Sequence, residues 1–206
     1  MAEKSEIRNP GFARGCAEAS PKSEIAIVAL GSNLGDSRQI ILDAMPRLQD
    51  FSNQPILKSS LWRTSPVNCP PGSPLFVNAV VGLAARAGET PESLFEKLHK
   101  LERESGRPPK KVLNEPRLLD LDLIAFGTET RPAAPTCLAG AWRRRKRSEG
   151  GNTPKLILPH PRAHLRRFVL QPLSEIAPDL ILPGQRRTIS ELLAELPGEE
   201  MVVRLL

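Results

Sequence analysis

The sequence predicts an α+β sandwich, in which an antiparallel-rich sheet is flanked by helices. Short apolar runs typical of strands alternate with amphipathic segments typical of helices, and no internal repeat is visible. The expected elements follow the order β-α-β-β-α-β, which is the order of a ferredoxin-like sandwich. The composition is that of an ordinary globular domain, with 40% hydrophobic and 25% charged residues in a chain of 206.

The first half of the chain contains three predicted strands, at Ile25–Leu30, Ile56–Arg63 and Leu75–Ala85. The first strand ends in a glycine loop, Gly31–Gly35, after which Asp36 or Ser37 can cap a helix. Pro46 falls within the apolar stripe of that helix. Because proline removes a hydrogen bond and crowds the preceding turn, we expect the helix to kink or restart there.

The second half begins with a well-marked helix. Thr90 is its expected cap and Pro91 its first residue, and Gly106 ends it. The buried stripe of this helix is formed by Leu94, Leu98 and Leu101. Further predicted elements are a fourth strand at Leu118–Phe126, a short extended piece at Leu156–Pro159, and helices near Pro172–Ala177 and at Ile189–Leu196.

Two segments differ in composition from the predicted domain at residues 24–206. Residues 1–23 are polar and lack the apolar stretch of a secretory signal, so we expect a disordered extension. Residues 128–155 read as a basic insertion. The net charge of +6 arises within residues 131–155, which hold seven Lys or Arg residues against a single Glu.

The cysteine pattern indicates a reducing compartment. The three cysteines, Cys16, Cys69 and Cys137, lie far apart and include no Cys-x-x-Cys pair. A disulfide framework or a zinc site is therefore not expected, and the cytoplasm is the simplest setting. No apolar run approaches the roughly 18–20 residues of a membrane span, so we expect no membrane partner.

The sharpest chemical signal is Asp120-Leu121-Asp122 within the fourth predicted strand. Side chains alternate across a strand, so the two aspartates share a face, with their carboxylates about 6–7 Å apart. Such a pair can bind two Mg²⁺ ions, which lie about 3.5–4 Å apart in two-metal sites. The alternative is the exposed polar face of an amphipathic strand. Arg107, Lys110 and Arg117 lie just upstream and favour a metal and polyphosphate site.

A second signal indicates a pocket for a flat heterocycle. Phe76 and Asn78 alternate with Val77 on the third predicted strand and therefore share a face. A carboxamide matches the amino-oxo edge of a pterin or guanine, and an aromatic ring can stack on the ligand. Taken singly, each of the two residues is more often structural.

Six stretches occurring in order resemble the 6-hydroxymethyl-7,8-dihydropterin pyrophosphokinase family. They are Ala29–Asp36, Ser60–Pro66, Phe76–Ala79, Pro116–Gly127, Leu158–Pro161 and Arg167–Pro178. Together they cover about residues 24–185, apart from the insertion. The resemblance implies a ferredoxin-like fold and transfer of pyrophosphate from ATP to the pterin alcohol, which yields AMP and the pterin diphosphate for tetrahydrofolate synthesis.

The resemblance also implies residue roles. The expected ligands of two Mg²⁺ ions are Asp120 and Asp122. The expected pterin contacts are Thr64, Val67, Phe76, Asn78 and Phe168. The expected ATP contacts are Arg107, Lys110, Arg117, His160 and Arg166. The partners would be these small molecules, and we expect a monomer.

The chain departs from the family pattern at Pro109, Asn114 and Glu115, which lie where the family carries an arginine and a Trp-Gly pair. These departures keep open a catalytically weakened, pterin-binding homologue. A second alternative is a nucleic-acid-binding module that uses Trp142 and the basic run Arg143–Arg147. Nucleic acid is the less favoured partner, because the basic excess is confined to the insertion.

Overall fold

The computed structural model describes residues 24–106, 116–131, 156–198 and 200–205. The predictions for residues 1–23, for Arg107 and Lys110, and for nearly all of the 128–155 insertion lie outside these ranges. Within them, none of the helices combines the length and apolar character that crossing a bilayer requires.

One sheet organises the described residues. Its strands are β1 (Ile25–Ser32), β2 (Leu57–Lys58), β3 (Trp62–Thr64), β4 (Phe76–Ala84), β5 (Asp120–Phe126) and β6 (Val202–Arg204). All pairings are antiparallel, in the order β5-β1-β4-β3-β6, and β2 also pairs with β4. If β2 and β3 are counted as one strand, β5 becomes the fourth strand of the chain and β4 the third. The neighbours in the sheet are then the fourth, first, third and second strands, in that order. The predicted ferredoxin-like α+β class is confirmed.

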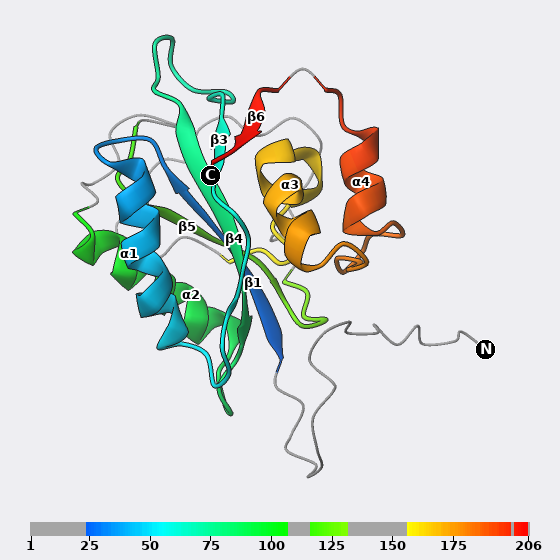
Figure 1. The fold of residues 1–206 in the computed structure, drawn as a ribbon. Coiled ribbons are helices and arrows are strands. Elements are labelled where there is room, and N and C mark those ends of the chain that lie inside the picture. Colours follow the sequence, from blue (N-terminus) through cyan, green and yellow to red (C-terminus); the bar gives the residue numbers. More distant parts are fainter. Residues whose placement is uncertain (1–23, 107–115, 132–155, 199, 206) are drawn as a thin grey trace, which may run out of the picture.

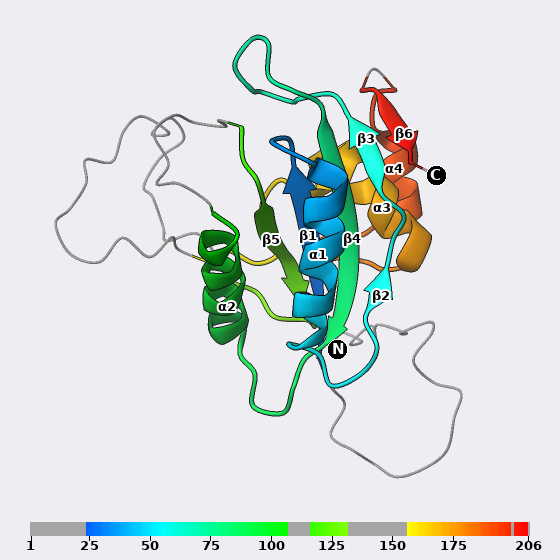
Figure 2. The same cartoon turned by 60° about the vertical axis from the view of Figure 1, so that its left-hand side comes forward.

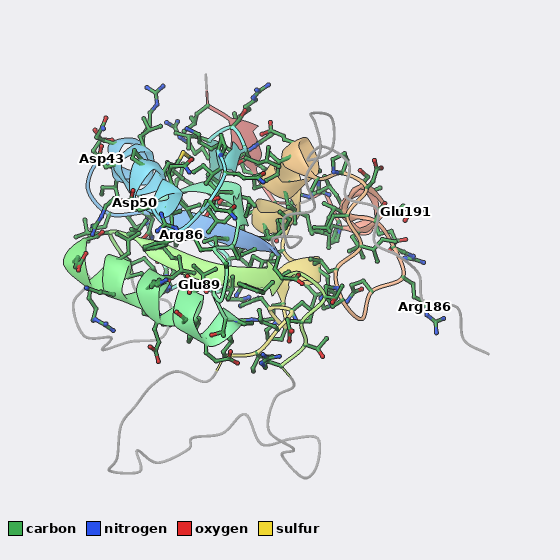
Figure 3. The ribbon with its side chains drawn as sticks, turned by 90° about the horizontal axis from the view of Figure 1, so that it is seen from below. Asp43, Asp50, Arg86, Glu89, Arg186 and Glu191 are labelled. Atoms are coloured by element: carbon green, nitrogen blue, oxygen red, sulfur yellow. The ribbon has the colours of Figure 1, made fainter. Side chains whose placement is uncertain are left out.

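Helices cover both faces of this sheet (Figures 1 and 2). The helices are α1 (Ser37–Gln49), α2 (Pro91–Glu104), α3 (Arg167–Ile176) and α4 (Ile189–Glu195), with a 3₁₀ turn, η1 (Ala163–Leu165), before α3. Helices α1 and α2 lie on one face, and α3 and α4 lie on the other. Figure 3 views the three layers from below, with exposed charged residues such as Asp43 and Glu191 on the outer sides of the helices.

The alternation of side chains along the strands produces two separate cores. Val28 and Leu30 of β1 pack toward α1 and α2, whereas Ile27 packs toward α3 and α4. The α1/α2 core is the larger. The α3/α4 core includes Leu170, Leu173 and other buried residues of the C-terminal helices.

Local signals explain where most helices begin. Asp36 accepts a hydrogen bond from the amide of Gln39 and caps α1, and Thr90 caps α2 in the same way through the amide of Ser93. Pro46 does not restart α1, which continues to Gln49. Met45 and Leu48 are buried on either side of the proline, and their packing outweighs one lost hydrogen bond.

The structure differs from the expected elements at β2 and β3, at α3 and at β6. The predicted strand Ile56–Arg63 divides into β2 and β3 at Ser59, whose hydroxyl accepts from the Val80 amide at 2.9 Å in place of a backbone carbonyl. The helix expected near Pro172–Ala177 begins earlier, at Arg167, and contains Pro172. Strand β6 was not predicted, because its three residues carry no pattern apart from their pairing with β3.

Candidate active site

The two aspartates of β5 project from the face of the sheet that α3 covers. Leu119, Leu121 and Leu123 are buried on the opposite side, in the α1/α2 core. Asp120 lies opposite Gly31 of β1, and Asp122 lies opposite Ala29. The predicted shared face is therefore present, and the small neighbours on β1 leave space beside the carboxylates.

Arginines partly neutralise this carboxylate pair. Arg117 Nη1 donates to Asp120 Oδ2 at 2.7 Å, and Arg166 Nη1 lies 3.8 Å from Asp122 Oδ2. Burial and the nearby Asp120 carboxylate raise the pKa of Asp122 to about 6. Burial is the larger of these two causes, and a cation bound beside the pair would favour the ionised form of Asp122.

Asn33 holds the backbone of Arg117 in place. The backbone amide of Asn33 donates a hydrogen bond to Arg117 O at 3.1 Å. The side-chain Oδ1 of Asn33 accepts a hydrogen bond from the backbone amide of Arg117 at 2.8 Å. Its Nδ2 donates to Pro74 O at 3.4 Å. Asn33 is buried. Its hydrogen bonds connect the glycine loop, the Arg117 segment and the loop before β4. The sequence marked this loop only by its glycines.

The residues predicted to form a heterocycle pocket lie beside the carboxylates. Phe76 and Asn78 of β4 share a face, and Thr64 of β3 lies opposite Phe76. Asn78 Nδ2 donates to Thr64 Oγ1 at 2.8 Å, and both side chains are buried. The Asn78 carboxamide is thus held in one orientation by a neighbour on the adjacent strand.

Gly31 forms part of the floor between the two groups of residues. It pairs with Asn78 on one side and with Asp120 on the other. A Cβ at this position would stand 3.1 Å from Asn78 Oδ1 and 4.0 Å from Phe76 Cδ1. The absence of a side chain at Gly31 therefore keeps the floor open, a role that the sequence did not reveal.

His160 and Arg166 form the wall of the site on the side of α3. Burial and the neighbouring Arg166 and Arg162 lower the pKa of His160 to about 4, so its imidazole is neutral near pH 7. Arg166 Cζ lies 5.3 Å from the centre of the Phe168 ring, within the range of a cation–π contact. The arginine thereby links the polar and aromatic parts of the wall.

A single cleft of about 260 Å³ brings these residues together. Ten of the predicted site residues line it: Thr64, Val67, Phe76, Asn78, Arg117, Asp120, Asp122, His160, Arg166 and Phe168. The other two, Arg107 and Lys110, lie outside the described residues. The cleft also contains residues that the sequence did not single out for a role, including Ala29, Gly31, Cys69, His99, Glu102 and Arg162.

A carboxylate pair, several arginines and neighbouring aromatic and carboxamide groups share one cleft, an arrangement that points to the phosphotransferases as the class of protein. Comparison with known proteins identifies the family. The sequence model of the 7,8-dihydro-6-hydroxymethylpterin-pyrophosphokinase (HPPK) family matches residues 27–178, and the chain belongs to this family.

Curated relatives agree with this assignment. The chain is 35% identical to a 2-amino-4-hydroxy-6-hydroxymethyldihydropteridine pyrophosphokinase of Pseudomonas aeruginosa, over 84% of this chain and 91% of the relative. It is 30% identical to the enzyme of the same name from Haemophilus influenzae, over 86% and 96%.

A solved HPPK-DHPS in complex with substrates has a similar fold, with a TM-score of 0.62 at 12% identity. The match covers 84% of this chain and 43% of that one. The chain therefore spans less than half of that larger protein, and the likeness concerns the fold alone.

Proposed function

We propose that this protein transfers pyrophosphate from ATP to 6-hydroxymethyl-7,8-dihydropterin, giving AMP and the pterin diphosphate in tetrahydrofolate synthesis. One observation carries the proposal: the carboxylate pair with its arginines and the pocket of Phe76 and Asn78 open into the same cleft. Both halves of the reaction would thus meet on one face of the sheet. Membership of the pyrophosphokinase family supports the choice of substrates.

The side chains on β5 suit Mg²⁺. Asp120 and Asp122 supply hard oxygen ligands, and the raised pKa of Asp122, caused by burial and then by Asp120, reflects negative charge that a cation would offset. Among the described residues, no group of three or more His, Cys, Asp or Glu side chains forms a complete metal cage. Mg²⁺ commonly binds through one or two carboxylates together with substrate phosphates. We therefore propose that two ions enter with ATP.

The chain's own groups then have distinct tasks. Phe76 and Phe168 would stack on the pterin, while Asn78 and the backbone at Thr64 and Val67 would bind its edge. Arg117 and Arg166 would bind phosphate oxygens, and the neutral His160 would offer a hydrogen bond without adding charge. Arg107 and Lys110 are proposed ATP contacts from the resemblance alone.

The proposed reaction is an in-line displacement. The hydroxymethyl oxygen of the pterin forms a bond to the β-phosphorus of ATP as the bond from that phosphorus to the α–β bridging oxygen breaks. The alcohol proton is released, and AMP leaves. When bound, Mg²⁺ neutralises the phosphate oxygens, and the residues of the cleft contribute orientation and electrostatic stabilisation.

We also propose that residues 24–206 form one pyrophosphokinase domain that works as a monomer in the cytoplasm. Cys69, which lines the cleft, is a free thiol, which suits a reducing compartment.

The direct test is a product assay with ATP, Mg²⁺ and hydroxymethyl-dihydropterin, in which nucleotides are separated chromatographically. We expect AMP and the pterin diphosphate in equal amounts, and no AMP when either the pterin or Mg²⁺ is omitted. Release of ADP, or AMP formation independent of the pterin, would contradict the proposed reaction.

Gly31→Ala is expected to raise the pterin KM about tenfold or more, because one methyl group in a ring pocket costs about 1–3 kcal/mol. The added methyl would approach the Asn78 carboxamide oxygen at 3.1 Å. The KM for ATP should change by less than about threefold in steady-state assays. Gly198→Ala is the control, because a Cβ there meets nothing within 4 Å. An unchanged pterin KM in Gly31→Ala would remove this glycine from the pterin site.

A further inference from the structure

We propose that Glu102 is a positioning residue that sets the spacing and direction of the Asp120 and Asp122 carboxylates. It belongs to α2, yet its Oε1 accepts the backbone N–H of Leu121, the residue between the two aspartates, at 2.8 Å. Glu102 is only 2% exposed and lines the same cleft. This inference rests on the proposed function, in which the two carboxylates bind Mg²⁺ together with ATP.

The position of β5 explains why such a contact matters. Strand β5 lies at one edge of the described sheet and pairs with β1 alone. An edge strand lacks a second neighbour to accept its outward amides and to fix its position. Glu102 supplies an acceptor for Leu121, so α2 takes the place of a further strand at this point. Because Leu121 joins the two aspartates in the chain, a displacement of its backbone would move both carboxylates.

Glu102 is itself held by a second contact. Its Oε2 lies 2.7 Å from His99 Nδ1, one turn earlier on α2. The His99 ring packs edge-on against Phe95, with ring centroids 4.3 Å apart and planes at 78°. Hydrogen bonds to a carboxylate are shorter and stronger than those between neutral groups. Both carboxylate oxygens of Glu102 are therefore held in place, Oε1 by Leu121 of the edge strand and Oε2 by His99 of its own helix.

The geometry assigns this role to the hydrogen bond and not to the charge. The negative charge of Glu102 repels that of Asp122 and contributes to the raised pKa of Asp122, so this charge does not favour the ionised carboxylate. An acceptor of the same length without a charge would still hold the Leu121 amide. A carboxylate shorter by one methylene would keep the charge but could not reach the amide. These two changes therefore separate positioning from electrostatics.

The experiment compares Glu102→Gln with Glu102→Asp. The affinity for Mn²⁺, used as a calorimetric substitute for Mg²⁺, is measured in the presence of α,β-methylene-ATP, and the half-saturating Mg²⁺ concentration is measured in the AMP assay. We expect about a tenfold or greater loss of metal affinity in Glu102→Asp and less than about a threefold loss in Glu102→Gln. Pterin affinity without metal should stay within about twofold. Glu96→Asp and Glu96→Gln, on the exposed side of the same helix, are the matched controls.

Each outcome decides the assignment. Wild-type metal affinity in both Glu102 variants would reduce Glu102 to a residue that only stabilises α2 against β5. A greater loss in Glu102→Gln than in Glu102→Asp would show that the charge matters, and would overturn positioning. If Glu102→Asp does not fold by circular dichroism, Glu102→Met replaces it, since it has similar length and no comparable acceptor; unchanged affinity there overturns the proposal. A wild-type protein that binds Mn²⁺ with the analogue but releases no AMP refutes the proposed function and leaves the affinity comparison valid.

Discussion

Replacing Asp122 with Asn is expected to reduce pterin-dependent AMP formation by about a thousandfold and to stabilise the metal-free protein. The amide is a poorer metal ligand, and losing about 4 kcal/mol of transition-state charge stabilisation corresponds to three powers of ten in rate. Initial rates of AMP release measure the effect at saturating substrates. Asp43→Asn, on the exposed side of α1, is the control and should retain wild-type rates.

The stability gain should depend on pH. The pKa of Asp122 is raised to about 6 by burial and by Asp120, from an ordinary value of 3.8. Folding therefore favours the protonated carboxyl, and the stability that this group contributes is present below pH 4 and lost as pH rises toward 6. The side chain is 39% exposed, so solvent screening reduces the expected gain of Asp122→Asn to about 1 kcal/mol above pH 6.

Urea unfolding in EDTA at pH 4 and pH 8 measures this difference. The gain should be near zero at pH 4. An equal gain at both pH values would mean that ionisation of Asp122 does not cost stability, and wild-type turnover would exclude Asp122 as a metal ligand.

Asn78→Ala is expected to lower kcat/KM for the pterin by about 10³-fold to 10⁴-fold, while the KM for ATP changes by less than about threefold. Sites built to hydrogen-bond a polar edge lose discrimination of this size when the bonds are removed. The variant also leaves the buried Thr64 hydroxyl without its 2.8 Å donor, which costs about 1–3 kcal/mol of stability.

Steady-state kinetics and urea unfolding of the same preparations separate these two effects. Asn53→Ala, at an exposed asparagine, serves as the control. An unchanged pterin KM in Asn78→Ala would place pterin recognition elsewhere in the cleft.

The main strands and the caps of the first two helices followed from local sequence patterns. Asp36 and Thr90 were identifiable because a cap depends on residues within one turn. The break at Ser59 and the existence of β6 depend on contacts with distant strands, and no local pattern encodes them. The continuity of α1 through Pro46 depends likewise on the packing of its neighbours.

The candidate site was predictable where alternation along a strand decided the geometry. Asp120, Asp122, Phe76 and Asn78 lie on the faces that a period of two requires. Gly31 was not assigned to the floor of the cleft, because strand register determines its position between Asn78 and Asp120. Glu102 did carry a signal: it lies four residues after the buried Leu98 and eight after Leu94, on the inward side of its helix.

The division of the interior into two cores has a consequence for how ligands would act on the whole molecule. Helix α3 carries Phe168 and belongs to the smaller packing unit, whereas Asp120 and Asn78 stand on the central sheet. Local unfolding of a protein often occurs in cooperative units of this kind. A nucleotide and pterin bound between them would tie the outer helical layer to the strands, so that local opening of this layer would first require their release.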